Sequence, residues 1–457
     1  MEWFVGSAKK DSYSEDFAED SCANTSYNLA ASPVDLWAGS TTRGTEGPAR
    51  GLNGTGTAAR TGWKYPYQPV SGCSVGQNNT CQIETDCQPY PGYPGPQVHG
   101  CDYEDALFTD FVRNAVLQHD EQRDGGLFVF WAPHVIHTPL SVPEVYLQRF
   151  AAIRDWRRRR YMAMVNYLDD SVGAVVDALA SRGLMDSTLI CFSSDNGGPV
   201  YGNGTSGANN WPLRGGKASN WEGGIRVNGW VSGGALASIH RGTRSQGLHA
   251  VWDWYATFAA IANVDPTDHR AALAGLPPVD GVSMWDYWSG KSTKSPRKSL
   301  AIGSCTAHVQ PASAAWPADG FDEWCGSPTD TTTVAGLIID NTDSNSTDSQ
   351  GLWKLIAEPR IPMNSWQGPF FPNSTATAFE TTYEFGCKEG CLFKLDVDPT
   401  EHHDLAKHQP SLVESMKKQI EEHQKTAFSP SRGTPQLEAA CSAAMNDWNG
   451  FWGPWLK

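Results

Sequence analysis

Apolar residues recur at helical spacing over one long stretch, and this stripe predicts a helix over about 157–181. Gly183 follows the stripe and indicates where the helix ends, because glycine readily adopts the backbone conformation that closes a helix. A shorter stripe at 108–116 predicts a second helix. The long stripe consists of Tyr161, Met164, Val165, Leu168, Val172, Val175, Val176 and Leu179.

Two short apolar runs flank the long helix and are typical of buried strands. The run at 127–131 precedes the helix, and the run at 188–193 follows it. A strand, a helix and a second strand in this order predict a βαβ unit with a parallel sheet. The first run leads to His137, and the second leads to Asp195 and Asn196. We therefore expect these polar residues at one edge of the sheet, where open α/β sheets bind their ligands.

The pattern changes in the last third of the chain. A connection rich in Ser, Thr and Pro at 291–298 is followed by short β-like runs and by a polar helix at 410–425. These elements predict a smaller α+β domain around an antiparallel sheet. We expect an α/β domain at 1–293, of which 1–102 is mostly loops, and the α+β domain at 294–457. The β-like runs are 334–339, 351–356 and 391–397.

Charge and hydropathy disfavour two classes of partner. The net charge of −15 at pH 7 argues against a broad surface for nucleic acid, because binding the phosphate backbone requires basic patches. No apolar run approaches the ~20 residues that a membrane-spanning helix needs. A dense arginine run at 154–160 is interpreted as a solvated helix face rather than as a steering surface.

Cysteines and glycosylation sequons indicate the secretory pathway, with the protein extracellular or in a lysosome-like compartment. Ten of the eleven cysteines lie in polar surroundings typical of disulfide-linked loops, whereas Cys191 lies in an apolar run and is expected to be a free thiol. The first residues show no basic segment followed by an apolar one, so no signal peptide is visible. The ten are Cys22, Cys73, Cys81, Cys87, Cys101, Cys305, Cys325, Cys387, Cys391 and Cys441. The sequons begin at Asn24, Asn53, Asn78, Asn203, Asn345 and Asn373.

Asp195 and Asn196 are candidate metal ligands. A carboxylate and an amide side by side offer hard oxygen ligands, which suit Ca²⁺ or Mg²⁺ rather than zinc. Asp-Asn-Gly-Gly is also an ordinary turn sequence, and this alternative stays open. Lys217 stands among glycines that let backbone approach a ligand, but it also fits a solvated lysine. His137 fits either a catalytic role or a hydrogen-bonded structural one.

These candidates stand within an ordered set of motifs in which the chain resembles the formylglycine-dependent (type I) sulfatases, and the arylsulfatase B branch most of all. Any one motif is weak, but the set covers nearly the whole chain. The motifs are APHVIHTPLSVP at 132–143, YMAMV at 161–165, FSSDNGG at 192–198, NNWPLRGGK at 209–217, WEGGIR at 221–226, WDWYAT at 252–257, DGVS at 280–283 and WKLI at 353–356.

The resemblance implies an alkaline-phosphatase-like α/β fold, with a mixed and mostly parallel sheet between helices, and hydrolysis of sulfate esters, here of a sulfated glycan. In this family a cysteine oxidised to formylglycine attacks sulfur, and Ca²⁺ binds the sulfate oxygens. The family's later calcium-binding pair corresponds to Asp195 and Asn196, its substrate lysine to Lys217, and its active-site histidine to His137. Cations would offset charge on the sulfate, and His137 would protonate the leaving alcohol.

The chain departs from the family pattern at the nucleophile. None of the eleven cysteines stands in Cys-X-Pro/Ala-X-Arg, and the family's early Asp-Asp pair is also absent. The resemblance therefore implies that the formylglycine lies upstream of Met1 and that this chain alone is inactive. Two alternatives stay open: a catalytically inactive protein that binds sulfated glycans, and a phosphate or phosphonate hydrolase of the same superfamily.

Overall fold

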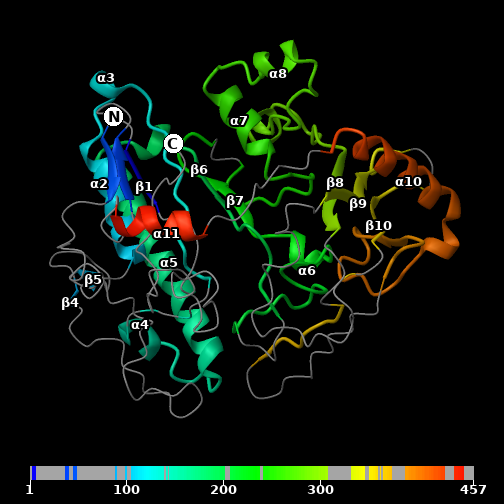
Figure 1. The fold of residues 1–457 in the computed structure, drawn as a ribbon, viewed down its shortest axis with the longest axis horizontal. Coiled ribbons are helices and arrows are strands. Elements are labelled where there is room, and N and C mark those ends of the chain that lie inside the picture. The colour runs from blue at the N-terminus through cyan, green and yellow to red at the C-terminus, as the bar shows by residue number, and fades with distance from the viewer. Residues whose placement is uncertain are drawn as a thin grey trace. The chain divides into compact units, whose positions relative to one another are not determined.

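The computed structural model divides into two compact units (Figure 1). Unit 1 consists of Met1–Met185 and Thr434–Lys457, and unit 2 consists of Asp186–Gly433. The domain boundary expected near residue 293 therefore lies inside unit 2. The residues described are 3–6, 37–40, 45–48, 88–89, 98–99, 104–137, 140, 142, 144–200, 206–236, 240–306, 331–344, 349–358, 361, 364–372, 386–427 and 437–446.

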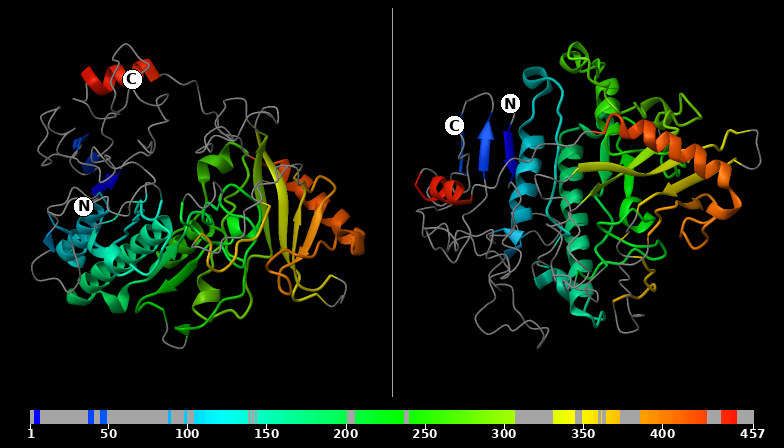
Figure 2. Two further views of the ribbon diagram at one scale, coloured as in Figure 1. Left: turned by 90° about the horizontal axis from the view of Figure 1, so that it is seen from below. Right: turned by 45° about the vertical axis from the view of Figure 1, so that its right-hand side comes forward.

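Unit 1 is dominated by two helices that lie side by side, α2 (Glu104–Gln118) and α5 (Trp156–Ser181), as Figure 2 shows. Both confirm the predicted helices. Shorter elements complete the unit, and most of the segment 1–102 lies outside the described residues. They are β1 (Trp3–Gly6), β2 (Trp37–Ser40), β3 (Thr45–Pro48), β4 (Gln88–Pro89), β5 (Val98–His99), α3 (Glu121–Asp124), α4 (Glu144–Gln148) and α11 (Leu437–Asn446).

Local signals fix both ends of α5. The Asp155 side chain accepts a hydrogen bond from the Arg158 N–H at 2.9 Å, which satisfies one of the free amides of the first turn. At the other end Gly183 has φ +68°, and the Leu184 N–H donates to the Leu179 carbonyl at 2.9 Å. This left-handed closure is the one for which glycine is suited, so the predicted end of the helix is confirmed.

The buried face of α5 is not the face that the valines indicated. Val165 is exposed, and the other valines of the stripe are half-buried. Small residues line the buried face because they let a neighbouring helix approach closely. The buried positions are Ala163, Met164, Tyr167, Ser171, Ala174, Ala178 and Leu179.

The run 127–131 does not form the buried strand that its apolar residues predicted. It has no strand assignment, and the side chains of Phe128 and Phe130 are 69% and 84% exposed. A strand of this composition is stable only when neighbouring strands and a covering layer bury it. Among the described residues no strand pairs with this run, which is why the prediction is wrong here.

Unit 2 begins with β6 (Ile190–Ser193), which confirms the strand predicted at 188–193. β6 pairs with β7 (Gly229–Ser232) in antiparallel fashion, and the parallel partner expected from the βαβ pattern is not among the described ladders. Short helices follow. They are α6 (Glu222–Ile225), α7 (Asp253–Ile261), α8 (His269–Leu273) and α9 (Trp285–Trp288).

A four-stranded antiparallel sheet with the order β11-β10-β9-β8 forms the C-terminal part of unit 2. Three of its strands and its helix were predicted, whereas β8 was not. Figure 2 shows α10 lying along this sheet. The elements are β8 (Ser299–Thr306), β9 (Thr331–Asp340), β10 (Leu352–Ile356), β11 (Cys391–Lys394) and α10 (Pro410–Gln424).

The two faces of this sheet pack against different partners, as the alternation of side chains along a strand requires. On β10, Trp353 and Leu355 pack in one cluster with Val413 and Met416 of α10. Ile356 lies in a second cluster on the opposite face, and this cluster contains Trp221 and Phe393. The second face therefore supports the glycine-rich segment at 214–224.

The described cysteines agree with the sequence interpretation where they can be compared. Cys387 and Cys391 form a disulfide, and Cys191 is a free thiol whose pKa burial raises to about 12. The side chains of the other eight candidate half-cystines and all six sequon asparagines lie outside the described residues. No helix in the described part of the chain is long and apolar enough to cross a membrane.

Candidate active site

Asp195 and Asn196 lie in the loop that follows β6, as the sequence predicted. The Asp195 side chain is exposed, and its Oδ1 accepts a hydrogen bond from the Asn196 N–H at 2.8 Å. The Asn196 Nδ2 donates to the Gly197 carbonyl at 2.8 Å, so its Oδ1 is the atom suited to ligate a cation. The loop thus presents one carboxylate and one amide oxygen side by side.

Backbone contacts hold this loop against the glycine-rich segment. The Gly197 N–H donates to the Gly224 carbonyl at 2.8 Å. A Cβ added at Gly197 would lie 1.7 Å from the Gly223 carbonyl oxygen, and a Cβ at Gly223 would lie 2.4 Å from the Arg214 carbonyl oxygen. No side chain fits at these positions, so glycine is required by close backbone approach.

Lys217 is brought to the same loop. Its N–H donates to the Gly198 carbonyl at 3.1 Å, and its side chain is half-buried. The Asn210 side chain joins the two segments, because its Oδ1 accepts from the Gly198 N–H at 2.9 Å. Its Nδ2 donates to the carbonyls of Gly198 and Gly215 at 2.8 and 2.9 Å. Asp195, Asn196 and Lys217 therefore stand on one interlocked pair of loops.

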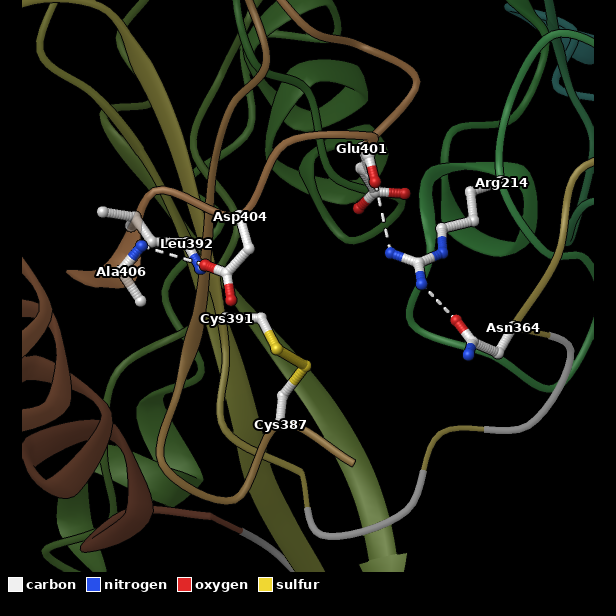
Figure 3. Close-up of a disulfide and its surroundings, with 8 residues drawn as sticks. All are labelled: Arg214, Asn364, Cys387, Cys391, Leu392, Glu401, Asp404 and Ala406. Carbon is white, nitrogen blue, oxygen red and sulfur yellow. Dashed lines mark hydrogen bonds between the residues drawn. A yellow bond between two sulfur atoms is a disulfide. The ribbon is translucent and has the colours of Figure 1, made fainter. Parts of the chain in front are cut away.

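Arg214 joins the glycine-rich segment to the C-terminal part of unit 2 (Figure 3). Its guanidinium lies between two indole rings, 3.6 Å from the centre of Trp221 and 4.5 Å from that of Trp366, and Trp366 stacks in turn on His402. It donates to the Glu401 carbonyl at 3.2 Å and to Asn364 Oδ1. Burial lowers the pKa of Arg214 to about 10, opposed by nearby acidic groups. Trp221 is completely buried and serves this packing.

A buried ionic cluster ties the glycine-rich segment to the C-terminal sheet. The Lys354 Nζ lies 2.9 Å from Glu222 Oε1 and 2.8 Å from Glu401 Oε1. Glu401 Oε2 also accepts the Glu222 backbone N–H at 2.8 Å. Lys354 and Glu401 have no exposed surface, and Glu222 is 3% exposed. We call these three residues the Lys354 cluster.

Charge pairing outweighs desolvation at the lysine of this cluster. Burial alone would lower the pKa of Lys354, but the Glu222 and Glu401 carboxylates raise it above its usual value. Burial raises the pKa of Glu401 more than Lys354 lowers it, and the Glu222 charge adds to the increase. The ion pairs of Lys354 were not predicted from the sequence, although a lysine between Trp353 and Leu355 in a buried strand indicates an ionic partner.

His137 lies in unit 1, whereas the other three predicted site residues lie in unit 2. It is half-buried, and its N–H donates to the His134 carbonyl at 2.9 Å. The His134 N–H is held in turn by Asp105 Oδ1 at 2.8 Å, so this segment is fixed to α2. The catalytic role of His137 stays a prediction.

The donor set agrees in kind with Ca²⁺ or Mg²⁺. Asp195 and Asn196 contribute two oxygen ligands, whereas Ca²⁺ takes six to eight. No group of three or more His, Cys, Asp or Glu side chains suited to hold a metal occurs among the described residues. The two residues fit one part of a calcium site, and a carboxylate beside an amide suits Ca²⁺ or Mg²⁺ rather than zinc.

The arginine run at the start of α5 is used in local packing. Arg157 and Arg160 lie over the Trp156 ring at 5.3 and 5.2 Å, and Arg158 lies over Tyr161 at 5.5 Å. The arginines at 157–160 are half-buried rather than fully solvated, so the expected solvated helix face is also a packed one.

Residues 54–264 match the family model described as Sulfatase. Arylsulfatase J of Mus musculus is 30% identical over 359 residues, which cover 78% of this chain and 54% of that protein. Human N-acetylgalactosamine-6-sulfatase is 28% identical over 177 residues, which cover 38% of this chain and 30% of that protein. The chain thus spans about half the length of arylsulfatase J.

The solved structure of Ps i-CgsB in complex with k-i-k-neocarrahexaose superimposes with a TM-score of 0.52 at 22% identity. The match covers 78% of this chain and 63% of that chain. A likeness at this identity concerns the fold alone. It confirms the alkaline-phosphatase-like α/β fold expected from the sequence.

Proposed function

The chain belongs to the sulfatase family, and from this premise we propose that the complete protein is a hydrolase of sulfate esters. The observation that carries the proposal is the pair of interlocked loops. The hydrogen bond from the Lys217 N–H to the Gly198 carbonyl at 3.1 Å puts a cationic residue beside the loop of Asp195 and Asn196. A carboxylate for a metal and an ammonium for the anion are what a sulfate site needs.

In this proposal the residues of the chain divide the work on a bound sulfate ester. Asp195 and Asn196 would hold Ca²⁺, or Mg²⁺ in its place, and the ion would supply positive charge against the sulfate oxygens. Lys217 binds the anionic group, and its backbone hydrogen bond to Gly198 holds it beside the loop of the metal ligands. His137 protonates the leaving alcohol. No cysteine of the chain stands in Cys-X-Pro/Ala-X-Arg, so we assign the role of nucleophile to none of its residues.

We propose a sulfated glycan as the substrate and the secretory pathway, extracellular or lysosome-like, as the location. One relative is named for N-acetylgalactosamine-6-sulfate, and one structural neighbour is complexed with a neocarrahexaose. The Cys387–Cys391 disulfide supports an oxidising compartment. Loops set specificity in such folds, so the individual glycan follows from the loops rather than from the family.

The test is turnover of 4-nitrophenyl sulfate by the full-length protein and its variants. Asp195→Ala should abolish metal-dependent turnover and weaken Ca²⁺ binding measured by calorimetry, because it removes the only carboxylate of the loop. Lys217→Ala should lower kcat/KM by about 100-fold or more. Lys418→Ala, a change at an exposed position of α10, serves as the control. Unchanged turnover in Asp195→Ala or Lys217→Ala would remove the site assignment. Glycan binding without any turnover by the wild type would favour the inactive binding protein instead.

A further inference from the structure

Two exposed aromatic rings lie on neighbouring loops of unit 2. The Trp211 side chain is 55% exposed and the Phe370 side chain is 69% exposed. Arg214, three residues beyond Trp211, is 6% exposed, and Phe371, next to Phe370, is 3% exposed. Each exposed ring therefore lies close in sequence to a buried side chain. Exposed aromatic surface of this kind is a feature of binding sites.

One side chain, Asn209, fixes both rings' loops. Its Oδ1 accepts from the Trp211 N–H at 2.7 Å, which sets the turn that carries the indole. Its Nδ2 donates to the Gly368 and Phe371 carbonyls, both at 3.0 Å. These two carbonyls flank Phe370, so the turn that carries the phenyl ring is held by the same amide.

The next residue, Asn210, connects this pair of turns to the candidate active site. Its side chain bonds both the N–H and the carbonyl of Gly198, the residue whose carbonyl also accepts the Lys217 N–H. Adjacent asparagines thus join the aromatic turns on one side and the sulfate-binding loops on the other.

We propose that Trp211 and Phe370 form an aromatic platform that binds a pyranose ring of a sulfated glycan beside the ester that is hydrolysed. The proposal rests on the proposed function and adds to it the substrate contact outside the sulfate. A sugar ring presents apolar C–H groups on its faces and hydroxyls at its edge. It can therefore cover an aromatic ring while its hydroxyls stay in water. A protein partner would need on the order of 20 residues on this side, which two rings do not supply.

The test compares a small substrate with a large one in the full-length protein. We would measure kcat/KM for 4-nitrophenyl sulfate, which has no sugar, and for hexasaccharides of chondroitin sulfate and carrageenan. Trp211→Ala and Phe370→Ala should each lower the ratio of hexasaccharide to aryl sulfate kcat/KM about 10-fold, mainly through KM. Tyr255→Ala is the matched control, because Tyr255 is also 55% exposed in unit 2 and should leave the ratio unchanged.

The results of this experiment test the aromatic platform separately from the hydrolysis of the sulfate ester. An equal loss on both substrates, or an unchanged ratio, would overturn the platform. If the wild type hydrolyses neither substrate, the proposed function fails, and calorimetry with the same hexasaccharides decides the platform by itself. Affinity at least 10-fold weaker in Trp211→Ala than in the wild type would support it. Equal affinities, or no binding by the wild type, would overturn it.

Discussion

Replacing Lys354 by methionine tests the importance of the Lys354 cluster. Methionine keeps the length of the buried stem but removes the charge that lies 2.9 Å from Glu222 and 2.8 Å from Glu401. Removing one partner of a buried ion pair costs about 3–5 kcal/mol, because the other partner is left uncompensated in a low dielectric. With both carboxylates at most 3% exposed, we expect the variant to lose about 4 kcal/mol of unfolding free energy at pH 7.

The loss should depend on pH with a definite sign. In the wild type the raised pKa of Lys354 means that its contribution is complete below its ordinary value of 10.5 and is lost as pH rises through the folded pKa. In the variant the penalty comes from ionised carboxylates. The raised pKa of Glu401, caused first by burial, means that its protonation relieves this penalty as pH falls toward its ordinary value of 4.5. The deficit should therefore be larger at pH 8 than at pH 5.

Urea unfolding followed by tryptophan fluorescence at pH 5 and pH 8 measures this deficit, provided that wild type and variant share one m-value. Lys418→Met is the control: the same substitution in an exposed pair with Glu414 at 3.7 Å should cost no more than about 0.5 kcal/mol. Adding Glu401→Gln to Lys354→Met should recover part of the loss. A deficit below about 1 kcal/mol, or one that is equal at both pH values, would refute the reasoning.

Two further substitutions test the interlocked loops and the disulfide. Gly197→Ala would place a Cβ 1.7 Å from the Gly223 carbonyl oxygen and should cost about 3 kcal/mol in urea unfolding, whereas Gly173→Ala, in an open helical position, should be neutral or stabilising. Wild-type stability in Gly197→Ala would contradict the close approach of the loops. Replacing Cys387 and Cys391 together by alanine should cost about 2 kcal/mol, because the bond closes a short loop. Thermal melts with and without reductant check this, and identical melts for wild type and variant would argue that the bond is not formed.

Local sequence patterns predicted the elements whose structure depends mainly on residues nearby in the sequence. The existence of α5 and its end at Gly183 are set by neighbours in sequence, and the structure follows them, although the valines of the stripe do not mark its buried face. The run 127–131 fails for the opposite reason. The sequence shows that this run is apolar. Whether neighbouring strands bury it depends on segments far away in the chain, and no strand pairs with it among the described residues.

The candidate site divides in the same way. Asp195, Asn196 and Lys217 were proposed because a strand end and a glycine-rich segment are visible in sequence, and the loops that carry them are in contact. The Lys354 cluster joins positions more than a hundred residues apart, as between Lys354 and Glu222. No sequence period or motif spacing predicts an ion pair between such distant positions. The buried strand around Lys354 indicates only that its partner is acidic.

The division of the chain into units has a consequence for its synthesis. Unit 1 is assembled from Met1–Met185 and Thr434–Lys457, with all of unit 2 between them in sequence. A ribosome adds about 5–20 residues per second, so the second stretch emerges on the order of ten seconds or more after the first. Unit 2 is contiguous, whereas the last helix of unit 1, α11, is translated only after it. The two stretches of unit 1 can therefore come together only after the whole of unit 2 has been translated.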